Sequence, residues 1–496
     1  MKPNYQNETT YGALCEVAGQ SIVECRLSGA EIATVLVCQP RVSLEQATCE
    51  NGEVRYSGKL LLSFVYENAN GEICRAERGA EFFHKAEHPM IAPAFTAVGG
   101  LKTQSVKLRR EGGQLIAACI VEGVFSVFGE RRHTYLAGGE GLLTQKKAQG
   151  FVSRYVAFAS VEDEDEFECD YAQDILLHTE TVSVTAVRAN AGAVDVDGEL
   201  CMHFCVLRAD GSLCSYERLI PVKAQALIDN AGVDSTATAK LEVLSTQVEA
   251  ATDEERGKSK IVLAYRLALT VWVEERVDTE VCVDAYSTAR ETELKFEKVV
   301  GRCAMKEKIV TERIHGTPIF DGSIEGQNAI TVVAPTVNVS LQCSERGWEA
   351  QGVIEGKALL KKEDGYACAD VSLPFLFPVE IDGSSVDVEG CVYGFGIRIR
   401  ASGEVEGEAS IKLRITPYKE CETFYLAEVT EGEEKQASTC AVSVYMPTRG
   451  DDLWTTAKRL SLSPDELRAA NPALTFPLKG DERIFVYRQK KENLQK

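Results

Sequence analysis

The stretch Gly-Lys-Leu-Leu-Leu-Ser-Phe-Val-Tyr at residues 58–66 decides the fold of most of this chain, because its pattern returns at residues 198–206 and 352–360. Each copy opens on a glycine, has a second glycine 13 residues later and a cysteine three residues after that. Alternating apolar side chains, such as Leu60 and Leu62, are typical of a β-strand with one buried face. These coincident spacings indicate three copies of one structural unit.

Each copy runs into hairpin-turn chemistry, with glycine at residues 71, 211 and 365 between two apolar runs. Further Val- and Ile-rich runs lie upstream and downstream, and helical patterns are few. We therefore expect a mostly β fold, in which three tandem β-sandwich-like repeat domains precede a small βααβ domain. The expected parts are β-rich repeats at residues 1–155, 156–300 and 301–427, an acidic and polar linker at 428–441, and the small domain at 442–490.

The small C-terminal domain is indicated by its caps and turns. Gly450 supplies a tight turn, and Asp452 stands at the N-cap of an apolar stripe with helical spacing. Residues 463–466 read Ser-Pro-Asp-Glu, a capping box with proline at the first helical position. Asn471 ends this second helix, and Pro472 prevents its continuation.

This ordered set of residues resembles a LysM module, a βααβ domain that usually binds N-acetylglucosamine polymers such as peptidoglycan. The resemblance implies a ligand groove between the loop after the first strand and the loop before the second. Asp452 stands where the family usually has Thr or Ser, which adds a charge to the groove and leaves open whether it binds a glycan or a protein. The matching groove residues are Gly450, Asp451, Asp452, Leu453, Asn471, Pro472, Ala473, Leu474 and Ile484.

Charge separates this small domain from the rest of the chain. The whole chain carries a net charge of −21, which argues against nucleic acid and against anionic membrane surfaces as partners. Residues 442–496 hold 10 Lys and Arg against 7 Asp and Glu, a net charge of +3 that leaves −24 for the remainder. The acidic run at residues 162–168 is expected to be a solvated segment between the first two repeats.

The 17 cysteines form no Cys-x-x-Cys pair, and most lie in apolar runs. The first residues carry no apolar signal region, and no later segment has the length of a membrane span. We therefore expect no membrane insertion, a reducing cytosol, and thiols that act as small buried apolar side chains rather than as a disulfide framework.

Cys201, His203 and Cys205 share one face of a predicted strand, which raises the question of a metal site. The corresponding residues of the first repeat are Leu61, Ser63 and Val65, so a second, partly covered sheet face is the other interpretation. No phosphate-loop or nucleophile-elbow motif is present. We therefore expect neither catalysis nor a cofactor, and a protein that acts by binding and assembly.

Taken together, three β-rich repeats and a C-terminal LysM-like module resemble the clostridial spore-coat assembly proteins of the SipL type. Residues 283–287, Val-Asp-Ala-Tyr-Ser, also resemble a recurring segment of that family. The resemblance implies a protein made in the mother-cell cytosol that localises to the surface of the forming spore. There it would help a coat-morphogenesis ATPase to encase the forespore, with the LysM module taking part in that partnership.

A second hypothesis is a glycan-binding structural protein of a phage tail or contractile injection baseplate, where LysM modules also accompany β-rich domains. Neighbouring genes would discriminate between sporulation and tail assembly. Tandem repetition favours the spore-coat hypothesis.

Overall fold

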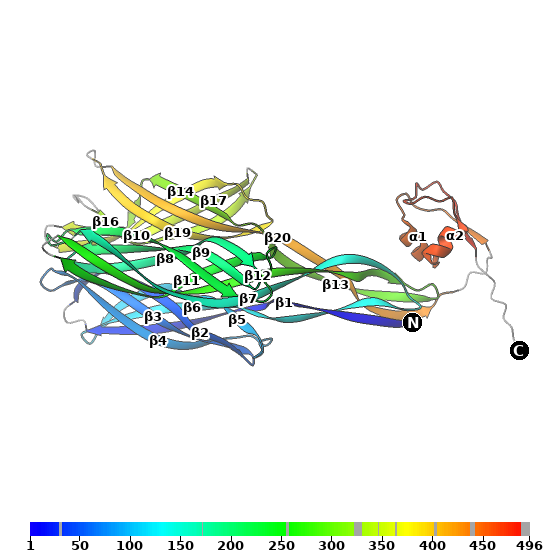
Figure 1. The fold of residues 1–496 in the computed structure, drawn as a ribbon, viewed down its shortest axis with the longest axis horizontal. Helices are drawn as coiled ribbons and strands as arrows, with labels where there is room; N and C mark the ends of the chain where they lie inside the picture. Colours follow the sequence, from blue (N-terminus) through cyan, green and yellow to red (C-terminus); the bar gives the residue numbers. More distant parts are fainter. Residues whose placement is uncertain are drawn as a thin grey trace.

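The computed structural model describes residues 1–28, 32–170, 172–253, 257–321, 330–345, 347–362, 365–400, 404–436 and 442–487. These described residues form 22 strands and two short helices, so the prediction of a mostly β chain is confirmed. Figure 1 shows an elongated molecule, with a broad body at one end, a narrow stem, and the two helices beside the tip of the stem.

The strands of the body fall into three successive units with closely related pairing. In the first unit, one sheet has the order β1-β6-β5 and the other has the order β2-β3-β4, and all pairs are antiparallel. The two sheets share one hydrophobic core, which includes Leu60, Leu62, Val121 and Phe125. The strands are β1 (Lys2–Ser28), β2 (Ile32–Glu50), β3 (Glu53–Asn68), β4 (Ile73–Glu87), β5 (Thr96–Glu111) and β6 (Gln114–Glu140).

The second unit pairs its strands in the same way, with sheets β7-β12-β11 and β8-β9-β10 around a core of their own. Its strands are β7 (Leu143–Asp170), β8 (Asp174–Asn190), β9 (Ala193–Leu207), β10 (Leu213–Leu227), β11 (Thr236–Asp253) and β12 (Lys258–Tyr286).

In the third unit the first long strand is interrupted, so that β13 and β14 pair with different halves of β20, and β15 adds to the edge of the second sheet. Its strands are β13 (Arg290–Ala304), β14 (Lys308–Gly316), β15 (Ile319–Asp321), β16 (Ile330–Ser344), β17 (Gly347–Lys362), β18 (Gly365–Val379), β19 (Ser385–Ile399) and β20 (Val405–Glu434).

The first glycine of the sequence pattern has the same physical cause in all three units. A Cβ atom at Gly58 would lie 2.8 Å from the backbone oxygen of Ser43, and one at Gly198 would lie 2.9 Å from that of Ser183. A Cβ atom at Gly352 would likewise meet the backbone oxygen of Asn338. Glycine is therefore needed where the neighbouring strand approaches too closely for a side chain.

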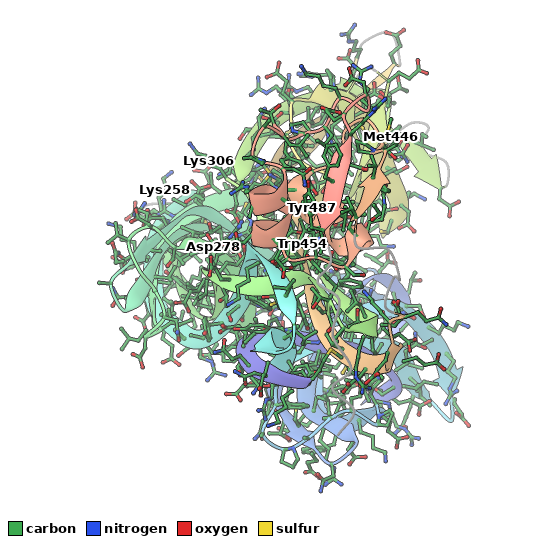
Figure 2. The ribbon with its side chains drawn as sticks, turned by 90° about the vertical axis from the view of Figure 1, so that its right-hand side faces the viewer. Lys258, Asp278, Lys306, Met446, Trp454 and Tyr487 are labelled. Carbon is green, nitrogen blue, oxygen red and sulfur yellow. A yellow bond between two sulfur atoms is a disulfide. The ribbon has the colours of Figure 1, made fainter. Side chains whose placement is uncertain are left out.

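The three units meet in a shared apolar cluster, to which each contributes residues from corresponding strands. Leu36 and Val37 come from β2, Leu176 and Leu177 from β8, and Val333 and Ala334 from β16. Viewed along the long axis, the three units appear as three lobes (Figure 2). The body is therefore one continuous structure and not three separate domains on a string.

The stem is formed where the shorter strands end and only the long pairs continue, at residues 2–12, 129–153, 275–303 and 419–434. Leu136, Cys282 and Leu426, one from each long pair, are fully buried together inside it. Three two-stranded antiparallel ribbons, β1 with β6, β7 with β12 and β13 with β20, enclose a common apolar core and make the stem a continuation of the body (Figure 1).

The structure places several predicted segments differently. Residues 155 and 300, chosen as boundaries, lie inside β7 and β13. The acidic run at 162–168 lies in β7, where Glu166 pairs with Lys260 and Asp165 pairs with Arg218. It is therefore not a segment between domains, because cross-strand pairing organises it as sheet, although its glutamates remain exposed on one side of the strand.

The predicted linker begins inside regular structure as well. Residues 428–434 continue β20, where Glu431 and Glu434 pair with Arg290, and residues 437–441 lie outside the described part. The expectation of reduced thiols also needs a correction, because Cys303 and Cys421 form a disulfide between β13 and β20. Gly301 lies opposite Cys421 in the strand pairing, and Cys303 lies two residues further along β13 on the same face. The two cysteines are therefore diagonal neighbours, with Cα atoms 6.2 Å apart. The 14 other cysteines of the described residues are free.

Candidate docking site at the tip of the stem

The C-terminal module has the element order strand, helix, helix, strand: β21 (Val442–Tyr445), α1 (Leu453–Leu460), α2 (Pro464–Ala470) and β22 (Ile484–Tyr487). The predicted caps are confirmed. The Asp452 carboxylate accepts a hydrogen bond from the Thr455 amide at 2.7 Å, and Ser463 with Glu466 forms the reciprocal capping box. The local sequence therefore fixes both helix starts, as the capping rules require.

The first predicted groove loop is tied to the segment that precedes β22. Gly450 has φ of +94°, a conformation that favours glycine, and its amide donates to the Leu478 carbonyl at 2.8 Å. The Leu478 amide donates in return to the Asp451 carbonyl. The Asp451 carboxylate accepts from the Thr448 amide and pairs with Arg459 at 2.7 Å, so it is already used within the module.

The second predicted groove loop starts at a residue that holds the module together. Buried Asn471 donates to the carbonyls of Leu467 and Phe485, and its amide oxygen accepts from the Phe485 amide at 2.8 Å. Its side chain therefore joins α2 to β22. Ile484 is fully buried in the module core, and Leu453 and Leu474 pack against that core. The exposed members of the predicted groove set are Gly450, Asp452, Pro472 and Ala473.

One face of helix α1 packs against the tip of the stem. The Trp454 indole Nε1 donates to Asp284 at 2.7 Å, and Lys458 pairs with the same carboxylate. The Trp454 and Tyr286 rings meet edge to face with centroids 4.9 Å apart. Figure 2, viewed from the tip of the stem, shows the module with Trp454 in front of the stem strands.

Tyr286 belongs to the core of the module as well as to β12. It is 1% exposed and packs with Ala457, Leu467 and Ile484. Its hydroxyl donates to the Leu462 carbonyl at 2.7 Å, and burial raises its pKa to about 12. The phenol therefore stays neutral and remains a donor at physiological pH.

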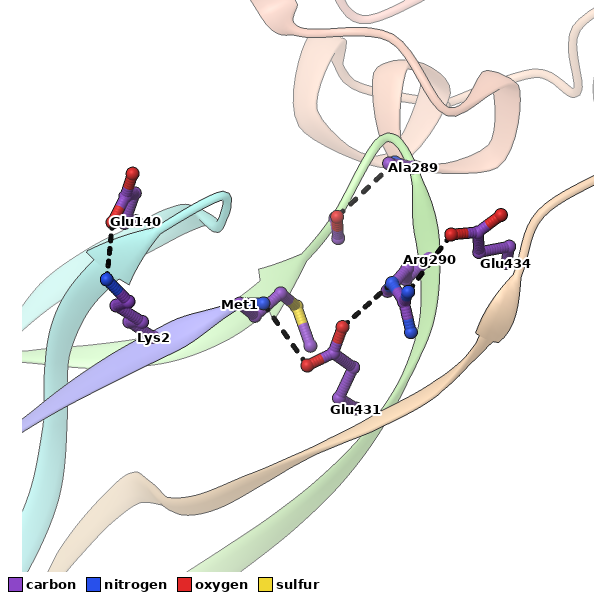
Figure 3. A network of polar contacts seen from close by, with 8 residues as sticks. Met1, Lys2, Glu140, Ala289, Arg290, Glu431 and Glu434 are labelled. Carbon is purple, nitrogen blue, oxygen red and sulfur yellow. Dashed lines mark hydrogen bonds and ion pairs between the residues drawn. The ribbon is translucent and has the colours of Figure 1, made fainter.

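A polar network closes the tip below the module (Figure 3). The Met1 ammonium and Arg290 both pair with Glu431, at 3.1 and 2.8 Å, and Arg290 also reaches Glu434. The Lys435 amide donates to the Ala289 carbonyl. The Lys435 ammonium donates to the Ser287 carbonyl of the stem and to the Ser461 hydroxyl of the module. The residue after β20 therefore connects the stem to the module.

Only part of this site could be predicted from the sequence. The family resemblance points to residues 283–287, which contain Asp284 and Tyr286, but it predicts no contact for them. Trp454 lies in the apolar stripe that follows Asp452, and this pattern predicts a buried ring without predicting a partner for its indole N–H. A buried Trp or Tyr usually finds a hydrogen-bond partner, which was the available signal.

The other chemical candidates are structural. Cys201, His203 and Cys205 are all buried, because β9 is covered on both faces, and the His203 imidazole lies 3.0 Å from the Val392 carbonyl of the third unit. Burial raises the pKa of the Cys205 thiol to about 12. Within the described residues, no group of three His, Cys, Asp or Glu side chains is arranged to hold a metal.

Neither of the two helices in the described part of the chain has the length and apolar character needed to cross a membrane. Comparisons with protein-family models, with curated proteins and with solved structures found no match to this chain.

Proposed function

We propose that this protein is a non-enzymatic assembly adaptor of the spore coat, and that its C-terminal part is a LysM domain that docks a coat morphogenetic ATPase or peptidoglycan. In this proposal the three β units are copies of one domain, and they act as a rigid support. The protein would work in the mother-cell cytosol, at the surface of the forespore. The sequence resemblance supplies the class of partner.

The observation that carries the proposal is the way the module is mounted. Asp284 and Tyr286 hold α1 against the stem, while Asp452, Pro472 and Ala473 remain exposed. A fixed module loses less freedom when it binds than a freely tethered one, which favours binding by preorganisation. A binding module that is held in a fixed orientation at the tip of a stem suits an adaptor.

Binding of the full-length chain tests the proposal. Two ligands are compared in parallel: the coat morphogenetic ATPase of the same organism, and purified peptidoglycan or chitooligosaccharide. The variants Asp452→Lys and Ala473→Arg change exposed groove positions, and Lys479→Ala on the same module serves as the control. We expect at least one ligand to bind and to lose about tenfold in affinity on the groove changes alone.

If neither ligand binds to the chain, the adaptor proposal is wrong. Glycan binding with no affinity for the ATPase supports instead a glycan-anchored structural protein of a phage tail or injection baseplate. An elongated three-lobed rod with a binding module at its tip is compatible with that second function.

A further inference from the structure

The module has an exposed apolar face on its two-stranded sheet. Val442 lies opposite Tyr487 and Val444 opposite Phe485, so these four side chains share one side, and Met446 continues the alternation. All five are between 42% and 58% exposed. We call these five residues the apolar face. The other side of the same sheet, with Tyr445, Ile484 and Val486, forms the module core or packs against it.

Positive charge borders the apolar face. Arg483 precedes Phe485 by two positions, so it lies on the same side of β22; it is exposed, and no described side chain pairs with it. The nine residues that follow Tyr487 hold four Lys and Arg and one Glu. They contain a single large apolar residue, Leu494, so this segment lacks the side chains needed to cover the face.

Two apolar faces from two molecules are also poorly matched to each other. Face-to-face pairing would bring two exposed Arg483 side chains towards the same interface, and like charges in contact oppose association. The occupant should instead offer negative charge beside apolar groups. The rest of the chain, with its net charge of −24 against +3 for residues 442–496, is the acidic surface at hand.

The second unit carries such a surface along β7. Glu162, Glu164, Glu166 and Glu168 alternate on the outward side of this strand, in line with Phe158, which is 55% exposed. We call these five residues the acidic strip. Residues between them, such as Val161 and Phe167, pack into the core of the unit and fix the outward direction of the strip.

Opposite charges on β12 only partly neutralise the acidic strip. Glu162 lies 3.9 Å from Arg266 and Glu166 lies 2.6 Å from Lys260. No described cation forms an ion pair with Glu164 or Glu168. The strip therefore keeps uncompensated negative charge beside an exposed aromatic ring, which complements the apolar face and its basic border.

We propose that the apolar face of the module binds the acidic strip of a second copy of this chain. The two surfaces of one molecule cannot meet while the module is docked. Leu143, at the start of β7, packs against the module core, and Phe158 lies 15 residues further along the same strand, about 50 Å away. The contact therefore joins two molecules head to tail, and the pair keeps one free apolar face on one molecule and one free acidic strip on the other.

Sedimentation velocity and light scattering of the full-length chain test this assembly. The face variant is Val444→Asp with Tyr487→Asp, and Arg483→Glu is a milder second variant that leaves the strands intact. The strip variant is Glu164→Lys with Glu168→Lys. The control for the strip variant is Glu16→Lys with Glu81→Lys. It changes the net charge by the same amount as the strip variant, but at exposed positions of the first unit.

We expect the average mass of the wild-type chain and of the control to rise above 54.3 kDa with concentration at low salt, and to fall as salt is added. Each face or strip variant alone should stay monomeric. An equimolar mixture of the face and strip variants should form heterodimers and nothing larger, because only one competent surface of each kind remains.

Three results overturn the proposal. The first is a wild-type chain that stays monomeric at low salt up to about 1 mM. The second is a strip variant that still dimerises alone, because the apolar face would then pair with itself. The third is a mixture of face and strip variants that contains only monomers. Capture of the wild-type chain by vesicles with anionic headgroups, without self-association, would assign the face to a lipid surface instead.

Discussion

At the scale of single residues, Asn471 shows how a predicted ligand position can be a structural one. Its amide makes three hydrogen bonds that join α2 to β22 while it is itself buried. The Asn471→Ala change leaves the backbone groups of Phe485 without partners. We expect the module to lose about 2–4 kcal/mol of local stability, since each unmade buried hydrogen bond costs about 1–3 kcal/mol. Hydrogen exchange of the β22 amides measures this loss.

The neighbouring exposed residue provides the control for that change. Pro472→Ala alters the next position without removing a side-chain hydrogen bond, and it should leave exchange of the β22 amides nearly unchanged. Equal effects of the two substitutions would show that Asn471 has no special role in holding β22.

Asp452 predicts a dependence on pH. Its hydrogen bond from the Thr455 amide lowers the pKa of this carboxyl below its usual value. A lowered folded-state pKa stabilises the module fully above the unfolded-state pKa of about 3.9, and the contribution is lost as pH falls through the folded-state pKa. The midpoint temperature of thermal unfolding of the module should therefore fall more steeply below about pH 4 in the wild type than in Asp452→Asn. The asparagine of this variant caps the helix without a charge.

At the scale of elements, the repeated glycines report the close approach of neighbouring strands. Gly58→Ala would place a methyl group 2.5 Å from Leu101 Cδ1 and 2.8 Å from the Ser43 oxygen. Overpacking of this kind costs about 1–3 kcal/mol. Gly12→Ala, in β1 of the same unit, meets no atom within 4 Å and is the matched control. Urea unfolding should separate the two variants, and similar midpoints would contradict this explanation of the repeat.

The contact between the module and the stem gives a second prediction at this scale. Asp284→Ala removes the partner of both the Trp454 indole and the Lys458 ammonium. We expect the docked state to weaken by about 1.5–3 kcal/mol, the range for hydrogen bonds to charged groups. Energy transfer between dyes on the stem and on the module should then report a larger undocked population.

Lys479→Ala, away from α1, is the control for this measurement. A double variant that combines Asp284→Ala with Lys458→Ala should lose less than the sum of the two single changes. Additive losses would show that these two side chains act independently.

The elements themselves could be predicted from sequence to a fair extent. Alternating residues around Leu60 and the capping box at Ser463 each depend on neighbours in the chain, and local patterns record such neighbours well. The continuation of β20 through Glu434 was missed because its glutamates read as a polar linker. Their pairing with Arg290 and Met1 joins distant parts of the chain, which no local pattern records.

At the scale of the whole molecule, the packing of the three units against one another could not be predicted from the sequence either. Leu36, Leu177 and Val333 lie in runs that look like ordinary strand cores, yet they pack together in one cluster. The same holds for the stem-tip site, because Asp284 and Trp454 are brought together only when β12 and the module meet. The repeated pattern predicts three units, but it does not predict the apolar cluster in which residues of all three meet.

The disulfide provides a prediction at this scale, because Cys303 and Cys421 close a loop of 118 residues that contains most of the third unit. Cys421→Ser should lower the free energy of unfolding by about 2–4 kcal/mol under oxidising conditions. Chemical denaturation with and without reductant measures this difference. Cys343→Ser, at an exposed free thiol of the same unit, should have no effect, and reductant should remove the difference between wild type and Cys421→Ser.

The three-lobed stem has a consequence for valency. A rod built from three identical chains would carry three C-terminal modules, one at each corner of its tip. Here a single chain supplies all three corners, and the module of the described residues packs against the corner formed by β7 and β12. Through this module each molecule makes one contact with a partner surface, so strong attachment through such modules requires several molecules side by side.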